Sequence, residues 1–383
     1  MGIPSDAPIR LHRKFERGDR NKITDVQGVR VGQVTLQDGE INTGVTAVLP
    51  HCGNIFRDKV MAGCSVLNGF GKSIGLVQIQ ELGTIETPIV MTNTLSIGTA
   101  FTALTKYMLE QNEDIGVSTG TVNCLVTECN DGRLNDIRGL HVREEHVRQA
   151  LDSASDDFEE GAVGAGTGMV CLGLKGGIGS ASRKITADGG EYVIGALVMT
   201  NYGSAGNLVI DGIHYDTTKA AARTDETSGC AGETSGCAGE TSGCAGESSG
   251  CAAGTTGAVS TGGEDKDRGS VIILIATDLP LSERQLTRVS KRAMIALART
   301  GSYCGNGSGD IAITFTTANR CAHYSEKDIL KYGMFFDENI DRVFEASVEA
   351  VEEALISSLY HAKTTEGVRG SRYMGLKDFL NMD

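Results

Sequence analysis

The segment RGSVIILIATDLPL, residues 268–281, contains the run VIILIATD (271–278), whose residues are all aliphatic or β-branched up to Thr277. Such a run predicts a strand that is buried on both of its faces. The dipeptide Gly269-Ser270 stands directly before it, and a polar tract without large apolar residues precedes the dipeptide. A small hydroxyl residue therefore lies at the boundary between a linker-like segment and a rigid, buried strand.

The polar tract contains a repeat. From Glu226 the chain reads ETSGCAG three times and then ESSGCAA, which ends at Ala253. A coiled coil needs apolar residues at two positions of each heptad, and these units have none. Their Gly, Ser and Thr content favours a flexible linker, which we place at residues 224–268. The repeated cysteines leave a metal-binding or partner-binding array as the alternative.

Strand-like and helical patterns alternate on both sides of this tract. The remaining predicted strands are 44–50, 87–93, 122–128, 162–174, 192–201 and 311–317. Helices are predicted near 96–112 and 142–154, from a capping box formed by Ser282 and Gln285, and across 340–359. The mixture predicts layered sheets covered by helices, with one core shared by the segments before and after the tract.

The charge, the apolar runs and the cysteine spacing of the chain argue against several classes of binding partner and site. The formal net charge of −14 makes nucleic acid and anionic membranes unexpected partners. No run of 18 apolar residues is present, and the first residues lack the apolar core of a secretory signal, so we expect a cytoplasmic protein. Seven cysteines outside the repeat show no CxxC spacing, which favours reduced thiols over disulfides or a zinc site.

The Gly269-Ser270 junction has a possible chemical meaning. Cutting the chain before Ser270 would give that residue a free α-amine, whose pKa of about 7.7–8.0 lets it accept a proton near neutral pH. Nucleophile and base would then belong to one residue. The dipeptide alone fits an ordinary junction between a linker and a strand better, so the hypothesis depends on other segments.

Two further motifs offer polar side chains beside predicted strands. In GNGSGDI (305–311), Ser308 and Asp310 are two residues apart, so in an extended segment they share a face and could both face Ser270. In VMTNYG (198–203), Asn201 could donate an N–H to an oxyanion. Taken singly, both motifs also suit ordinary turns. The glycine-rich segment 164–183 does not have GxGxxG spacing, so we interpret it as close backbone packing.

Together these segments resemble the L-aminopeptidase/D-esterase-amidase family, which includes the β-peptidyl aminopeptidases. The resemblance covers nearly the whole chain in order, and the segments 268–281 and 298–319 are its most specific part. It also runs through NKITDVQGVRVGQVTL (21–36), GVTAVLP (44–50), CNDGRLNDIRGLHV (129–142), VGAGTGMVCLGLKGGIGSASR (163–183) and VMTNYG (198–203).

The resemblance implies a four-layer αββα sandwich of the N-terminal-nucleophile-hydrolase type, made as one chain that cuts itself between Gly269 and Ser270. Ser270 matches the nucleophile. Ser308 and Asp310 match a serine and an acidic residue that help to activate it, although some relatives have Glu at the latter position. Asn201 matches the oxyanion donor, and Glu128 lies where a carboxylate holds the amino group of the substrate.

The resemblance further implies a single catalytic domain built from residues 1–269 and 270–383, assembled into homo-oligomers, often tetramers. Its substrates would be small peptides, amides or esters with a free amino terminus, and it would need neither metal nor cofactor. Asn130 stands where some relatives have an aromatic residue near the pocket, which leaves substrate preference open. An acyltransferase of the same self-cleaving type is the alternative enzyme, and a core that merely presents the cysteine repeat is the non-enzymatic one.

Overall fold

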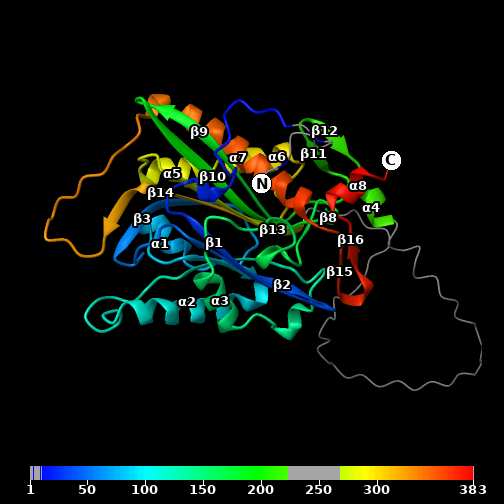
Figure 1. The fold of residues 1–383 in the computed structure, drawn as a ribbon, viewed down its shortest axis with the longest axis horizontal. Coiled ribbons are helices and arrows are strands. Elements are labelled where there is room, and N and C mark those ends of the chain that lie inside the picture. The colour runs from blue at the N-terminus through cyan, green and yellow to red at the C-terminus, as the bar shows by residue number, and fades with distance from the viewer. Residues whose placement is uncertain (1–2, 4–8, 10, 223–267, 383) are drawn as a thin grey trace, which may run out of the picture.

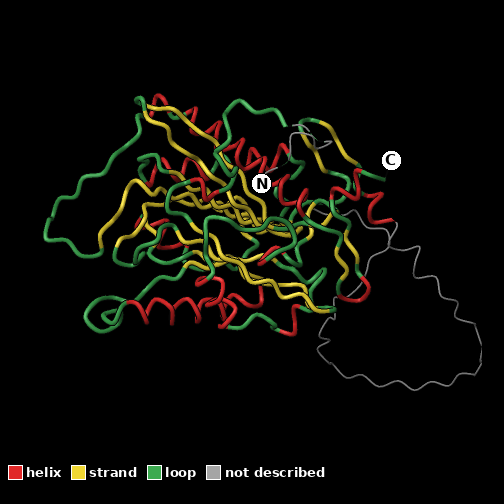
Figure 2. The backbone as a smooth tube through the Cα atoms, viewed as in Figure 1, coloured by secondary structure: helices red, strands yellow, loops and turns green. Residues whose placement is uncertain are grey.

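The computed structural model describes residues 3, 9, 11–222 and 268–382, and in these residues two β-sheets stack face to face (Figure 1, Figure 2). The first sheet has four strands, in the order β1 (Arg30–Asp38), β2 (Ile41–Leu49), β5 (Ile89–Asn93) and β6 (Leu125–Cys129). The second has six, in the order β4 (Thr84–Ile85), β3 (Asp58–Gly69), β14 (Gly307–Ala322), β13 (Arg268–Thr277), β10 (Gly190–Asn201) and β9 (Ile178–Ala187). Neighbouring strands are antiparallel except the pairs β5–β6 and β13–β14.

Helices cover the outer face of each sheet (Figure 1). The helices α5 (Glu283–Ser290), α6 (Ala293–Arg299) and α7 (Asp341–His361) lie over the six-stranded sheet, and α2 (Ile97–Gln111) and α3 (Glu144–Asp152) lie over the four-stranded one. Shorter elements are α1 (Leu76–Leu82), α4 (Thr218–Ala222), α8 (Leu376–Leu380), β7 (Val170–Cys171), β8 (Leu174–Lys175), β11 (Leu208–Ile210), β12 (Ile213–Tyr215), β15 (Thr365–Glu366) and β16 (Arg372–Tyr373). The four-layer αββα architecture expected from the sequence is confirmed.

The central strand β13 shows how the sequence pattern produces these layers. Ile272 and Leu274 belong to the core between the two sheets. The alternate residues Ile273 and Ile275 belong to the core under α5, α6 and α7. Both faces of the strand are therefore buried, because successive side chains of a strand point to opposite sides of the sheet.

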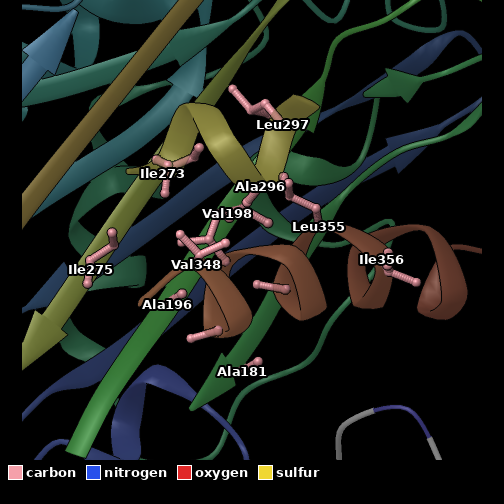
Figure 3. Close-up of a cluster of buried hydrophobic side chains, with 14 of the residues drawn as sticks. Ala181, Ala196, Val198, Ile273, Ile275, Ala296, Leu297, Val348, Leu355 and Ile356 are labelled. Carbon is pink, nitrogen blue, oxygen red and sulfur yellow. The ribbon is translucent and has the colours of Figure 1, made fainter. Parts of the chain in front are cut away.

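The long helix α7 packs closely on β9 and β10 (Figure 3). Small side chains such as Ala181 and Ala196 line the sheet beneath it and face Val348 of the helix and its neighbours. At Gly179 the approach is so tight that a Cβ atom would lie 2.0 Å from the carbonyl oxygen of Ala354. Glycine and alanine in the sheet thus let the helix lie directly against the strands.

The two predicted parts of the chain share one sheet. In the six-stranded sheet, β13 and β14 lie between β3 on one side and β10 on the other, so strands from after the junction are flanked by strands from before it. Residues from both sides of the tract also contribute to the same two hydrophobic cores. The predicted linker, apart from Arg268 at the start of β13, lies outside the described residues together with the whole repeat.

Three expectations about local structure need correction. The segment 162–174 is not a strand: after Gly164, which has φ +53°, it forms only the short hairpin β7–β8, whose turn residues Leu172 and Gly173 also have positive φ. The helix predicted from Ser282 is two helices, α5 and α6, although its capping box is present. Strands β1, β3 and β9 were not predicted, because their mixed polar and glycine content hides the alternation.

The thiols of Cys52, Cys64, Cys124, Cys129 and Cys321 form no disulfide, as expected. No helix in the described ranges is long and apolar enough to cross a membrane.

Candidate active site

Ser270 lies near the start of β13, with a neighbouring strand on each side. The register places it opposite Asn201, the last residue of β10, and opposite Gly309 of β14. Its side chain is buried but borders a cavity of about 410 Å³. The residues that line this cavity are Phe70, Lys72, Thr94, Glu128, Asn130, Gly132, Arg133, Ile137, Asn201, Gly269, Ser270 and Gly307.

Gly269 occupies a position that no other residue fits without strain. Its φ is +137°, in the region that favours glycine. A Cβ atom here would lie 1.9 Å from the carbonyl oxygen of Asn201 on the neighbouring strand. The backbone immediately before Ser270 is therefore fixed both by its own conformation and by close contact with β10.

Ser308 and Asp310 form a buried pair on β14. The hydroxyl of Ser308 donates to Oδ1 of Asp310 over 2.6 Å. The parallel register sets Ser308 beside Gly269 and Asp310 beside Val271, and paired residues share a face of the sheet. The two side chains thus flank the Gly269–Ser270 peptide, instead of sharing the face of the Ser270 side chain as the sequence suggested.

The side-chain amide of Asn201 is held at both ends by backbone groups. The N–H of Val170 donates to its Oδ1 over 3.1 Å, and its Nδ2 donates to the carbonyl oxygen of Asn130 over 2.9 Å. A backbone N–H can only donate and a carbonyl can only accept, so these partners fix which end of the amide carries nitrogen. The amide nitrogen has a second N–H, and the side chain borders the same cavity as Ser270.

Glu128, near the end of β6, contributes a buried carboxylate to the cavity. One of its oxygens accepts the backbone N–H of Lys72 over 2.7 Å, and the other accepts the hydroxyl of Thr94. Among the described residues no basic side chain forms an ion pair with it. A carboxylate anchored in this way offers a site for a cationic group that enters the cavity.

Asn130 also lines the cavity, but it is exposed, unlike Ser270, Asn201 and Glu128. Its side chain is exposed and caps a turn by accepting the N–H of Gly132 over 2.9 Å. Its backbone carbonyl holds Asn201, as described above. The described structure therefore gives Asn130 a clear backbone role beside the cavity, while a role in substrate binding stays a prediction.

The sequence profile of peptidase family S58 matches residues 21–373. The chain belongs to peptidase family S58. It is 48% identical to the PH0078 protein from Pyrococcus horikoshii OT3, with a TM-score of 0.81 over 97% of this chain and 96% of that one. It is 36% identical over 363 residues to the β-peptidyl aminopeptidase BapA of Sphingosinicella microcystinivorans, which is 92% of this chain and 84% of the relative.

A third similarity links the family to a fold class. The L-aminopeptidase D-Ala-esterase/amidase from Ochrobactrum anthropi is 32% identical, with a TM-score of 0.78 over 96% of this chain and 93% of that one. That protein is described as a prototype of the serine aminopeptidases and a variant of the N-terminal-nucleophile hydrolase fold. This S58 peptidase is accordingly a hydrolase of that class with serine aminopeptidase or amidase function, and the family resemblance seen in the sequence is confirmed.

Sequence reasoning missed Cys129, whose thiol touches the site of this S58 peptidase. The thiol of Cys129, between Glu128 and Asn130, hydrogen-bonds Ser270 and also donates to the carbonyl of Met199 over 3.8 Å. Burial is the main reason that the pKa of this thiol is raised well above its usual value, with the nearby Glu128 charge adding to the rise. Cys129 therefore remains a protonated thiol next to Ser270. Its position between two predicted site residues was the available signal.

Proposed function

We propose that this S58 peptidase cuts its own chain between Gly269 and Ser270 and then uses Ser270 to release N-terminal residues from short peptides, amides or esters. One observation carries the proposal. The hydroxyl residue that follows the positive-φ glycine is flanked by an amide donor, Asn201, and by the Ser308–Asp310 pair on its two neighbouring strands. A nucleophile, a donor and a hydroxyl–carboxylate relay are the parts that acyl transfer requires.

Self-cleavage proceeds through an ester. Ser270 Oγ attacks the carbonyl carbon of Gly269, its proton passes to the Ser270 nitrogen, and the C–N bond breaks to leave Gly269 esterified to Ser270. Water then hydrolyses the ester and gives a Gly269 carboxylate and a free Ser270 α-amine. Holding the hydroxyl next to its own preceding carbonyl makes the attack intramolecular, where effective molarities reach about 10⁵–10⁸ M.

The Ser308–Asp310 pair is suited to bind the nitrogen of Ser270, which takes up the proton when the peptide bond breaks. Because Ser308 donates its proton to Asp310, the lone pairs of its oxygen can accept an N–H from the nitrogen of Ser270. The register places Ser308 beside Gly269, at the peptide that is cut. After cleavage the same pair orients the α-amine, which acts as the base that takes the Ser270 hydroxyl proton when substrate is attacked.

Glu128 supplies the preference for a free amino terminus. Its carboxylate is buried in the cavity wall, and a substrate ammonium would give it the cationic partner that the described residues do not. The carbonyl next to that ammonium would then lie toward Ser270, with Asn201 donating to the oxyanion. Turnover would form an acyl-Ser270 ester that water hydrolyses.

A denaturing gel combined with intact-mass measurement tests the proposal. The wild-type protein should give two fragments, the second beginning at Ser270, whose masses add up to that of the full chain plus one water. Ser270→Ala should give one uncut, folded and inactive chain. An active wild-type enzyme that stays a single chain of 383 residues would contradict self-cleavage. A Ser270→Ala protein that hydrolyses amino-acid p-nitroanilides at the normal rate would contradict the nucleophile.

A further inference from the structure

A buried lysine lies behind the residues that line the cavity and does not line it itself. Lys175, in β8, is fully buried, and its Nζ donates to the carbonyl oxygens of Gly166 at 3.0 Å, Met169 at 2.8 Å and Gly176 at 2.6 Å. An ammonium has three N–H donors, whereas a neutral amine has two. Three carbonyl acceptors around one nitrogen therefore match the charged form, and the loop from 164 to 176 is folded around this cation.

Asp131 lies on the other side of the same loop and is also fully buried. At Gly168 the two segments are so close that a Cβ atom would lie 2.8 Å from the Cβ of Asp131. Burial lowers the pKa of Lys175 to about 7 and raises that of Asp131 to about 7, and the attraction between the two charges opposes both shifts. Among the described residues the two side chains form no ion pair: Oδ1 of Asp131 accepts from Nδ2 of Asn135 over 3.0 Å, and the aspartate acts on the ammonium only across the loop.

Both charged residues adjoin the groups that hold Asn201. Val170, whose N–H binds Oδ1 of Asn201, directly follows Met169, one of the carbonyls on the lysine. Asn130, whose carbonyl binds Nδ2 of Asn201, directly precedes Asp131. A carbonyl that binds the lysine is thus one residue from the group that holds one end of the Asn201 amide, and the aspartate is one residue from the group that holds the other end.

We propose that the Lys175 ammonium, held by three backbone carbonyls with Asp131 on the other side of the loop, is an internal cation that sets the orientation of the Asn201 amide toward the reacting carbonyl. Lys175 is a positioning residue, because it borders neither the cavity nor Ser270. The inference rests on the proposed role of Asn201 as oxyanion donor. Without the cation the three carbonyls repel one another, the loop shifts Val170, and the amide loses its fixed direction.

The expected effect falls on the transition state. An oxyanion donor strengthens its bond as charge develops, so a misdirected amide lowers kcat and leaves KM nearly unchanged. Removing one such donor outright lowers kcat by about 10²–10³-fold. Lys175→Met, which keeps the length of the side chain but not its charge, should lower kcat by a smaller factor, about 10–10²-fold.

A double-variant cycle tests the link. Lys175→Met, Asn201→Ala and the combination are compared on an amino-acid p-nitroanilide, with rates normalised to the self-cleaved fraction. If Lys175 acts through Asn201, Lys175→Met lowers kcat alone but causes no further loss when Asn201 is already alanine. Losses that multiply in the combined variant would overturn the inference. An Asn201→Ala enzyme with normal kcat would instead overturn the role of Asn201 in the proposed function.

Two more variants complete the design. If Lys175→Met does not fold, Asp131→Asn enters the same cycle, and losses that multiply with Asn201→Ala would again overturn the inference. The matched control is Lys22→Met, which removes another buried lysine that binds a backbone carbonyl, that of Phe158, remote from the cavity. This control should lower the melting temperature and leave kcat of the folded protein within about two-fold of wild type.

Discussion

Replacing Gly269 with alanine should slow self-cleavage while the chain still folds. The new Cβ atom would lie 1.9 Å from the carbonyl oxygen of Asn201, a backbone atom of a central strand that has no rotamer by which to move away. The φ of +137° adds conformational strain for any residue with a side chain. A strained backbone position costs about 1–3 kcal/mol, and relieving an overpacked contact costs about another 1–3 kcal/mol.

The sum, about 2–6 kcal/mol, is less than the stability of most native domains, about 5–15 kcal/mol. The cheapest relief is a shift of the first residues of β13, because the strand is anchored beyond Val271 by both cores. A displacement of about 1 Å between hydroxyl and carbonyl lowers the rate of an oriented reaction by about 10²-fold. Gly269→Ala should therefore be cut about a hundred times more slowly than wild type.

Cell-free synthesis followed by a denaturing gel gives the time course, with the fragment 270–383 quantified against the uncut chain. The matched control is Gly189→Ala, because Gly189 also has a positive φ of +76° but no atom within 4 Å of the added Cβ. It should lose some stability and process normally. Processing of Gly269→Ala at the wild-type rate would refute the argument that this backbone geometry exposes the scissile carbonyl.

Three other outcomes are expected. Glu128→Gln should lower kcat/KM for free-amine substrates by about 10–10²-fold, the strength of a hydrogen bond to a charged group, and equal rates of the wild type on acetylated and free substrates would exclude this role. Glu353→Gln should cost about 1–3 kcal/mol in urea unfolding, because Arg183 would lose the charge of one buried partner at 2.7 Å and keep the other, Glu349, also at 2.7 Å. Although burial raises the pKa of Glu353, the charges of Arg183, Arg13 and Arg17 lower it overall, so its stabilisation is present above about pH 4.5 and fades in acid. Deleting residues 226–253 should leave folding and cleavage intact, and an insoluble or uncut product would contradict the linker interpretation.

The sequence predicted those strands and helices whose apolar residues occupy the positions that are buried in the structure. The run at 271–278 is apolar at successive positions because β13 has a core on each face. The segment 162–174 has a comparable apolar content, yet it folds as a loop. Its glycines permit positive φ, and apart from the short hairpin β7–β8 its backbone bonds to side chains such as those of Lys175 and Asn201. Hydrophobicity alone does not distinguish these two cases.

The groups at the site also fall into two kinds, those that the sequence could mark and those that it could not. Ser270, Asn201 and Glu128 lie at strand ends that a motif can mark, and the described structure brings all three to one cavity. Their supporting groups were not foreseeable, because Val170 and Lys72 act through backbone N–H groups, which every residue except proline has. Which backbone group reaches which side chain depends on strand register and loop conformation.

Ser270 lies where one strand provides both a rigidly held hydroxyl and an irregular backbone conformation at the preceding residue, Gly269. A catalytic hydroxyl must be held within a fraction of an ångström, which a strand with a neighbour on each side provides. The proposed cut instead needs a backbone conformation at Gly269 that departs from regular strand geometry. Both are met at the start of β13, since Gly269 pairs with Ser308 in the ladder yet has a positive φ, and Val271 follows with its side chain in the core under the helices. Moving the serine two residues inward would bury it between the sheets beside Ile311, away from the glycine that contacts β10.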